Sequence, residues 1–257
     1  MPSSRAWSNA LSDPSWLQRA SVLKSESHTT VCRTTFLGLG VVVKSFVLTT
    51  PIARLKSFLR LSRAWRHQRG ADRLRRVGIP TAPCLAIVRA NGFEYLIMPA
   101  LPGKTVLQHL ADDDLSPRQQ HSLARALGRQ LARLTAAHLS NRDHKPSNLI
   151  VTSWRDSEPE LAVIDSVAIH RRRDIHRMLF ALLVEPVGTG LCPRRTILMR
   201  SLTVVIDATQ PHLTRPDRRS LRRAWWLQLS DTLASHGDPR PQTSPLVSSE
   251  NPPRDPA

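Results

Sequence analysis

Cysteine, glycine and aromatic residues are all scarce in this 257-residue sequence, and no long apolar run is present. The cysteines, Cys32, Cys84 and Cys192, are odd in number and form no CxxC pair, so their spacing favours neither a disulfide framework nor a zinc site. A membrane-spanning helix needs roughly 18 uninterrupted apolar residues, and the first residues lack the apolar stretch of a signal peptide. We expect a cytoplasmic protein that is soluble or at most peripheral to a membrane.

Acidic residues are also few, with 20 Asp and Glu against 37 Lys and Arg, which gives a formal net charge of +17. Such a charge attracts polyanions, namely nucleic acid, anionic lipid head groups or phosphorylated glycans. Because arginine strongly outnumbers lysine, biased codon usage explains the charge equally well, and both explanations stay open. A nucleic-acid-binding protein is an alternative argued from charge alone. The sequence has no zinc-finger spacing and only 5% aromatic residues, so we expect no specific nucleic-acid partner.

The first half of the sequence is rich in patterns typical of β-strands. β-branched runs separated by turn residues predict a three-stranded meander over residues 21–47. Apolar residues at helical spacing predict one helix from Ala53 to Val77, which Gly78 and Pro80 end. A second pair of strands follows, and an Asn-Gly hairpin signal joins them.

The second half is mainly helical in pattern. Ser116, followed by proline and then by glutamine at the capping-box position, predicts a helix that ends near Ala137. A small β-hairpin follows, and helices are expected over residues 171–184 and 215–235. The Pro-rich segment 236–257 has no apolar periodicity and reads as a disordered tail. The predicted class is α+β, with a flexible N-terminus over 1–20, a first lobe over 21–99 and a second lobe over 100–235.

Polar residues able to handle ATP occur in a definite order along the chain. Lys44 ends the strand-like run VVV, and Asp143, Lys145 and Asn148 lie in a loop between a long helix and the apolar run LIV. Asp165 follows the apolar run LAVI and so lies at the end of a strand. Phosphoryl transfer needs cations for the phosphates, oxygen ligands for a metal, and a carboxylate for the acceptor hydroxyl. Each of these is present here.

These segments resemble known kinase motifs. NRDHKPSNLIV resembles the catalytic loop HRDxKxxNxL of the protein-kinase-like superfamily, IDS resembles its DFG metal site, and VVVK resembles its third-strand lysine motif. The runs LKSESHTTVCRTTFLGLGVVVK, RVGIPTAPCLAIV and RRRDIHRML look more narrowly like the lipopolysaccharide core kinases, the Kdo and heptose kinases of bacterial envelopes. The resemblance implies a protein-kinase-like two-lobed fold with a β-rich first lobe and a mainly helical, shortened second lobe.

The same resemblance implies a role for each motif residue. Lys44 would contact the α- and β-phosphates of ATP. Asp143 would be the catalytic base, and Lys145 would neutralise charge on the γ-phosphate. Asn148 and Asp165 would bind Mg²⁺. Any one of these residues alone fits turn chemistry, helix capping or protection of a sheet edge, so the hypothesis depends on their order and context.

Further roles are implied outside the catalytic loop. Backbone groups of Pro99, Ala100 and Leu101 would form the hinge that receives adenine, and residues 25–30 would be the turn over the phosphates. Asp174 resembles the aspartate that anchors the catalytic loop, but it could equally cap the helix that follows.

The sequence departs from the family pattern at several positions. The turn over residues 25–30 lacks glycine, Asn141 replaces the usual histidine of the catalytic loop, and Ser166 follows the metal aspartate. The helix Ala53–Val77 contains no glutamate to pair with Lys44, and Asp72 is its only acid. Asp72 or a carboxylate from elsewhere would have to orient the lysine.

The short stretch between Asp165 and the next predicted helix leaves no room for a long activation loop. This favours a glycan, glycolipid or small-molecule acceptor over a protein. By resemblance, we expect a monomer that uses ATP and Mg²⁺ to phosphorylate a sugar hydroxyl of lipopolysaccharide core or a related envelope glycan. Its positive charge would suit peripheral contact with the anionic inner face of the cytoplasmic membrane. A pseudokinase scaffold and a kinase with another acceptor are the alternatives.

Overall fold

The computed structural model describes residues 2–235 apart from 14, 37, 173 and 192–193. The chain divides into two compact units. The first comprises Met1–Pro102 together with Ala162–His170, and the second comprises Gly103–Leu161 together with Arg171–Ala257. The predicted tail over 236–257 lies outside the described residues. Within the described ranges, no helix combines the length and the apolar character needed to cross a lipid bilayer.

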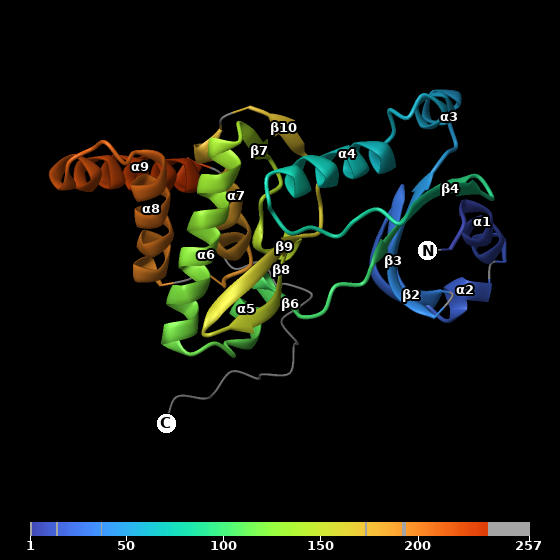
Figure 1. Ribbon diagram of the computed structural model, residues 1–257, viewed down its shortest axis with the longest axis horizontal. Coiled ribbons are helices and arrows are strands. Elements are labelled where there is room, and N and C mark those ends of the chain that lie inside the picture. The colour runs from blue at the N-terminus through green and yellow to red at the C-terminus, as the bar shows by residue number, and fades with distance from the viewer. Residues whose placement is uncertain (1, 14, 37, 173, 192–193, 236–257) are drawn as a thin grey trace. The chain divides into compact units, whose positions relative to one another are not determined.

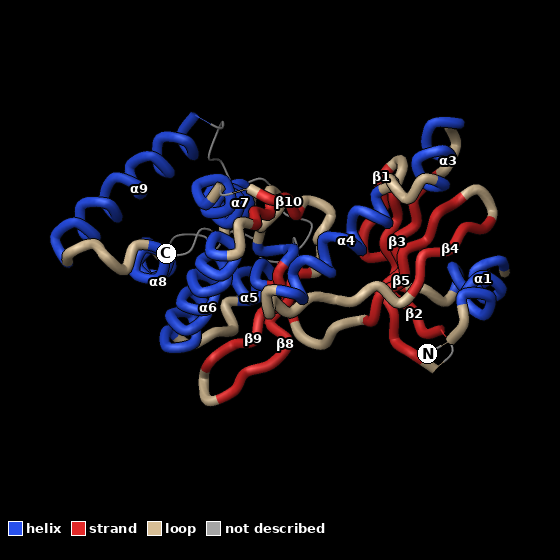
Figure 2. The backbone as a smooth tube through the Cα atoms, turned by 45° about the horizontal axis from the view of Figure 1, so that its top comes forward, coloured by secondary structure: helices blue, strands red, loops and turns tan. Residues whose placement is uncertain are grey.

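The first unit is built on an antiparallel sheet with the strand order β1-β2-β3-β5-β4 (Figure 2). The predicted meander and the second strand pair are therefore present, and β3 and β5 join them edge to edge. The strands are β1 (Ser21–Glu26), β2 (Thr29–Phe36), β3 (Leu39–Val47), β4 (Ala86–Ala90) and β5 (Phe93–Pro99).

Alternation along β3 divides the core of this unit between the two faces of the sheet. Val41 and Val43 are buried in one cluster, while Phe46 belongs to a second cluster with Leu96. Successive side chains of a strand point to opposite faces, so Lys44 shares the face of Phe46. Helix α4 (Arg63–Arg76) contributes Ala64 to the cluster on that face.

The first twenty residues are not the flexible segment that we expected. They form helices α1 (Ser4–Ser12) and α2 (Ser15–Gln18), which pack on the opposite face of the sheet from α4. Trp7, Leu11 and Trp16 are each at most 3% exposed, and both tryptophan rings contact Phe36. The prediction was wrong because three widely spaced apolar side chains in a polar segment give little periodic signal, yet they cover a sheet face that would otherwise be exposed.

The predicted helix Ala53–Val77 is two helices, α3 (Pro51–Phe58) and α4. Arg60 between them has φ 57°, in the left-handed region, which ends the first helix. The Ser62 side chain then accepts a hydrogen bond from the Trp65 N–H and caps the second. The apolar spacing continued across this break and concealed it.

The second unit is mainly helical (Figure 1). As predicted, α6 begins with a Ser116 capping box and an N-terminal proline. Arg171, the expected first residue of the next helix, instead ends β10, and the helix starts at Ile175 after an Asp174 cap. The elements from Lys104 onward are β6 (Lys104–Thr105), α5 (Val106–Asp112), α6 (Pro117–Ala136), β7 (Leu139–Asn141), a 3₁₀ helix (Pro146–Asn148), β8 (Leu149–Arg155), β9 (Glu158–Val163), β10 (Ile169–Arg171), α7 (Ile175–Gly188), α8 (Arg195–Thr209) and α9 (Arg215–Ser235). The last residues of β9 and the first two of β10 belong to the first unit.

Helix α8 was not predicted from the sequence, although it packs closely against α6. Gly128 of α6 allows this approach, because a Cβ there would lie 2.8 Å from the Ser201 carbonyl oxygen. The Ser201 hydroxyl in turn donates to the Ala124 carbonyl at 2.8 Å. The α+β class is confirmed, with a β-rich first unit and a mainly helical second unit.

Candidate functional site

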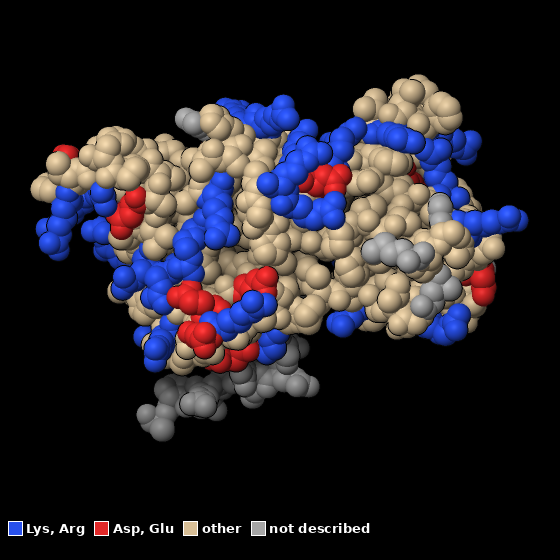
Figure 3. Space-filling view, viewed as in Figure 1, with Lys and Arg blue, Asp and Glu red and all other residues tan. Residues whose placement is uncertain are grey.

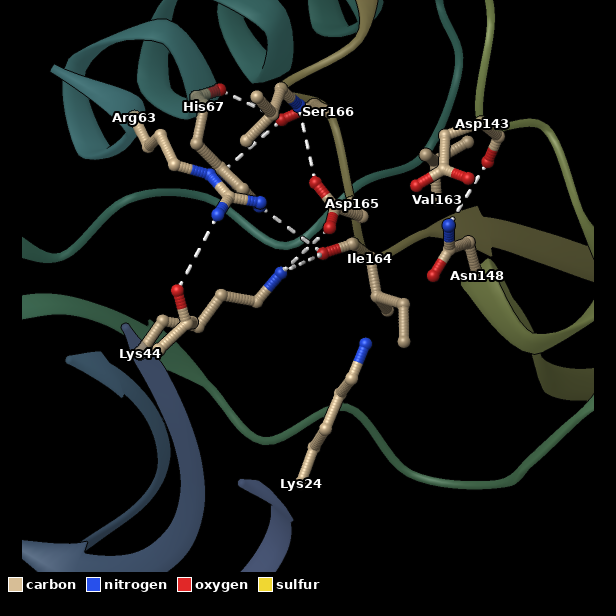
Figure 4. A network of polar contacts seen from close by, with 12 residues as sticks. Lys24, Lys44, Arg63, His67, Asp143, Asn148, Val163, Ile164, Asp165 and Ser166 are labelled. Carbon is tan, nitrogen blue, oxygen red and sulfur yellow. Dashed lines mark hydrogen bonds and ion pairs between the residues drawn. The ribbon is translucent and has the colours of Figure 1, made fainter. Parts of the chain in front are cut away.

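Lys44 and Asp165, which are far apart in sequence, form an ion pair within the first unit. The Lys44 Nζ lies 3.3 Å from the Asp165 Oδ2 and 3.4 Å from the Ile164 carbonyl oxygen (Figure 4). The side chains are 12% and 27% exposed, so the pair is largely shielded from water. The carboxylate that orients Lys44 is therefore Asp165. Asp72, the candidate on the helix, pairs with Arg75 instead.

The ion pair keeps the Asp165 carboxylate ionised. Burial alone would raise the pKa of Asp165, but the charge of Lys44 and the hydrogen bond from the Val167 N–H outweigh it, and the pKa is lowered. A carboxylate that stays charged is the form that a hard cation requires.

Backbone hydrogen bonds join the Asp165 segment to the first unit. Val163 donates its N–H to the Pro80 carbonyl at 2.9 Å, and the Thr81 hydroxyl donates to the Val163 carbonyl at 2.6 Å. Thr81 and Val163 also form an isolated parallel bridge. The strand end that carries Asp165 is thus held in the same unit as Lys44.

His67 of α4 contacts this segment, although the family pattern would call for a glutamate on that helix. Its Nε2 lies 3.2 Å from the Ile164 carbonyl, and its Nδ1 lies 3.1 Å from the Ser166 hydroxyl (Figure 4). Burial lowers the pKa of His67 to about 4, and the nearby charge of Lys44 acts in the same direction. His67 is therefore neutral at pH 7, and it supports the Asp165 backbone without competing for the carboxylate.

Gly70, one helical turn after His67, allows α4 to approach the same segment closely. A Cβ at this position would lie 1.9 Å from the Ser166 carbonyl oxygen, far inside any contact distance. Ser166 is fully buried, and its hydroxyl donates to the His67 carbonyl at 2.7 Å. Ser166, which follows Asp165, thus fastens this segment to α4.

The predicted catalytic loop, in the second unit, brings Asp143, Lys145 and Asn148 together. Asn148 donates its side-chain amide to the Asp143 carbonyl at 3.0 Å (Figure 4), and the Lys145 Nζ lies 3.6 Å from the Asp143 Oδ1. The Asn148 bond uses the amide nitrogen and leaves its Oδ1 as an acceptor for a cation. Asn141, which replaces the usual histidine, accepts the Asp143 N–H at 3.1 Å and so supports the loop.

Glu185 of α7 is a loop contact that sequence reasoning missed. Its carboxylate accepts both the N–H and the hydroxyl of Ser147, at 2.8 and 2.6 Å, and lies 3.9 Å from the Lys145 Nζ. Asp174 caps α7 by accepting the Arg177 N–H at 3.2 Å, which confirms the capping interpretation. Glu185 is thus the α7 acid that holds the loop beside Lys145.

His144 lies between Asp143 and Lys145 in sequence but faces the protein interior. It is fully buried, and among the described residues neither ring nitrogen has a hydrogen-bond partner. Burial lowers its pKa to about 4, so the ring is neutral at pH 7 and acts as a core residue under the loop.

The predicted hinge residues follow the end of β5. Pro99 pairs with Val41 and has no N–H, while Ala100 donates its N–H to the Gly40 carbonyl at 2.9 Å. Among the three predicted hinge residues, only Leu101 can therefore offer a backbone N–H to a base.

The predicted turn over the phosphates, residues 25–30, is mostly paired strand. Ser25 pairs with Thr30 and Glu26 with Thr29, which leaves a two-residue turn. Figure 4 shows two further cations of this unit near Lys44, namely Lys24 of β1 and Arg63 of α4. Sequence reasoning gave neither a role, because both belong to runs of basic or polar residues.

The donor atoms present match magnesium better than a transition metal. The candidate ligands are oxygens of Asp165 and Asn148, and Mg²⁺ is typically held by one or two protein oxygens together with substrate phosphates. Among the described residues, no group of three or more His, Cys, Asp or Glu could hold a metal without such help. The oxygen donors of Asp165 in the first unit and of Asn148 in the second, each taken by itself, therefore fit magnesium.

A separate apolar cavity of about 400 Å³ lies within the second unit. Leucine is the most frequent residue in its mainly apolar lining, and Pro146 of the 3₁₀ helix reaches it. Its described lining contains none of the polar loop residues discussed above, so the cavity is distinct from them.

Sequence reasoning missed His67, Gly70 and Glu185 because each acts through contacts far along the chain. The one usable signal was the absence of a glutamate from the predicted helix Ala53–Val77, since Lys44 of β3 then needs a carboxylate from elsewhere.

The chain matches no protein-family model and no curated protein sequence. Among solved structures, it is similar to the kinase domain of Mycobacterium tuberculosis PknI, with 15% identity and a TM-score of 0.44 over 85% of this chain and 96% of that one. A second structure of the same kinase domain gives 16% identity and a TM-score of 0.45 over 84% and 96%. Its C20A mutant gives 17% identity and a TM-score of 0.44 over 80% and 93%. At these values the argument for function has to come from the residues of the chain itself.

Proposed function

We propose that this protein is an ATP-dependent phosphotransferase. The observation that carries the proposal is the shielded ion pair between Lys44 and Asp165, residues far apart in sequence. It brings the cation proposed to bind phosphates beside the carboxylate proposed to bind the metal. An ion pair by itself is also explained by a role in stabilising the fold. Here it lies at a strand end, in a chain that also carries the loop residues Asp143, Lys145 and Asn148.

The chemistry would proceed by direct transfer. Asp143 accepts the proton of the acceptor hydroxyl as that oxygen attacks the γ-phosphorus, and the bond to the β-phosphate oxygen breaks. Lys44 holds the α- and β-phosphates, and Lys145 balances charge on the group in transfer. Asp165 and Asn148 would hold Mg²⁺, which supplies charge neutralisation between the phosphates when bound.

For the acceptor, we propose a sugar hydroxyl of lipopolysaccharide core or a related envelope glycan, in line with the resemblance of the sequence runs to the Kdo and heptose kinases. The segment between Asp165 and α7 is short and contains β10, which supports an acceptor smaller than a folded protein. A protein acceptor is the second candidate.

The test separates binding from turnover. Thermal unfolding of the wild type and of Asp165→Asn is followed with and without Mg-ATP, and a stabilisation confined to the wild type supports metal-nucleotide binding at this site. Labelled ATP is then supplied with core oligosaccharide or with generic protein substrates. Transfer to the glycan supports the proposal, and transfer only to proteins rejects the glycan acceptor. Binding without any turnover identifies a pseudokinase.

A further inference from the structure

A cluster of large apolar side chains is exposed at one end of the first unit. Leu55 and Phe58 of α3 are 56% and 72% exposed, and their neighbours along the chain are similar. We call this set the α3 apolar face. Its members are Ile52, Leu55, Phe58, Leu59 and Leu61.

Helix α3 is attached to its unit through a buried polar side chain instead of through apolar ones. Its one buried side chain among the described residues is the polar Ser57, which is fully buried and donates to the Glu94 carboxylate at 2.5 Å. Arg89 donates to the Ser57 hydroxyl at 2.6 Å and also to its carbonyl. An ordinary surface helix buries its apolar side and exposes its polar side. Here a polar network holds the helix, and the apolar side faces outward.

Positive charge surrounds this face. No Asp or Glu occurs in the sequence between Glu26 and Asp72, whereas basic residues recur throughout α3, the following turn and α4. Figure 3 shows Lys and Arg bordering the tip that α3 occupies in Figure 1. Between Pro51 and Asp72 the Lys and Arg residues are Arg54, Lys56, Arg60, Arg63, Arg66 and Arg69.

We propose that the α3 apolar face docks on an anionic lipid bilayer. Apolar side chains would enter the boundary between head groups and acyl chains, and the neighbouring cations would lie at the level of the lipid phosphates. A contiguous exposed apolar patch marks an interaction site, and its cationic border selects an anionic occupant. A second copy of the chain fits less well, because an isologous contact would bring the same cations face to face.

This inference does not depend on phosphotransferase activity, because none of the five residues of the α3 apolar face belongs to the candidate nucleotide site. It also assigns a function to part of the net charge of +17, which the sequence alone could not separate from compositional bias.

Flotation of the full chain with vesicles tests the proposal. We expect binding to phosphatidylcholine vesicles that contain phosphatidylglycerol, much weaker binding to phosphatidylcholine alone, and a loss of binding at high salt. The double variant Leu55→Ser, Phe58→Ser should lower the partition coefficient about tenfold or more. Leu227→Ser is the matched control, because Leu227 is 52% exposed on α9, and it should leave binding unchanged.

A second pair of variants tests the charge. Lys56→Gln should lower binding to anionic vesicles about fivefold, whereas Arg155→Gln at the end of β8 should have no effect. Melting temperatures of all variants establish that each remains folded.

Several outcomes would overturn the proposal. One is equal vesicle binding by the wild type and the α3 double variant. Another is an equal loss in the Leu227 control. A third is concentration-dependent self-association in light scattering that the Phe58 substitution abolishes, which would identify the face as a contact between copies of the chain.

Discussion

The Lys44–Asp165 pair and the catalytic loop hold their polar groups in contrasting ways. The pair is shielded, with exposures of 12% and 27%, and hydrogen bonds from two other segments fix its surroundings. In the loop, Asp143 is 46% exposed and Lys145 is 34% exposed, and the two are 3.6 Å apart. The first arrangement is suited to holding a constant polyphosphate group. The second leaves its carboxylate open to an acceptor from solution.

This contrast predicts that removing the loop carboxylate will have the largest effect on turnover. Asp143→Asn should lower kcat by about 100- to 10,000-fold, because the acceptor proton loses its base. ATP affinity, measured by calorimetry, should change little. Asp156→Asn, in the turn between β8 and β9, is the matched control, and an equal loss in that variant would deny Asp143 a special role.

Removing the shielded cation should affect binding as well as turnover. Lys44→Met should weaken Mg-ATP binding by about tenfold or more, since charge-assisted bonds contribute roughly 1.5–3 kcal/mol each, and it should also lower kcat. Lys104→Met serves as the control, because Lys104 pairs with Asp112 and Asp114 on the surface of the second unit. Unaltered ATP affinity in Lys44→Met would show that Lys44 does not bind the phosphates.

The close contact between Gly70 of α4 and Ser166, next to the Lys44–Asp165 pair, can be broken by adding one methyl group. Gly70→Ala should lower the free energy of unfolding by about 1–3 kcal/mol, because a Cβ 1.9 Å from the Ser166 carbonyl forces α4 and that segment apart. Gly188→Ala, where a Cβ would meet nothing within 4 Å, should change stability much less. Urea unfolding of both variants makes the comparison, and equal effects would contradict the close approach of α4.

The smallest expected effect concerns pH. The pKa of His67 is about 4 in the folded protein against 6.5 ordinarily, so between these values the unfolded chain binds the extra proton. Stability contributed by the neutral ring is therefore complete above pH 6.5 and falls as the pH is lowered towards 4.

Between pH 7 and pH 5, this linkage amounts to about 1–2 kcal/mol. Urea unfolding of His67→Asn should show a shallower dependence on pH than the wild type. His28→Asn, at an exposed turn, should keep the slope of the wild type. Parallel slopes for the wild type and His67→Asn would mean that the ring is not held in its neutral form.

Local patterns predicted much of the architecture. The alternation around Lys44, the hairpin signals and the Ser116 capping box act within a few residues, and the corresponding elements are present. The break at Arg60 was hidden because apolar spacing persisted across it. Helices α1 and α2 were hidden because Trp7, Leu11 and Trp16 are too few to establish a period.

The site was predictable in its residue types and less so in its contacts. The order of Lys44, Asp143 and Asp165 pointed to phosphate chemistry, but no local rule reports that His67 and Gly70 meet a serine about a hundred residues away. Such partners are set by tertiary packing, which sequence periodicity does not encode.

The assignment of residues 162–170 to the first unit has a practical consequence for dissecting the chain. A fragment ending at Pro102 would leave the ammonium of Lys44, the ring of His67 and the carbonyl of Pro80 without the groups they bond to here. Such a fragment would lack the strand end that carries Asp165, so its nucleotide binding would not represent that of the full chain. A minimal first unit therefore needs both stretches, rejoined by a linker, so the gene cannot simply be cut in two.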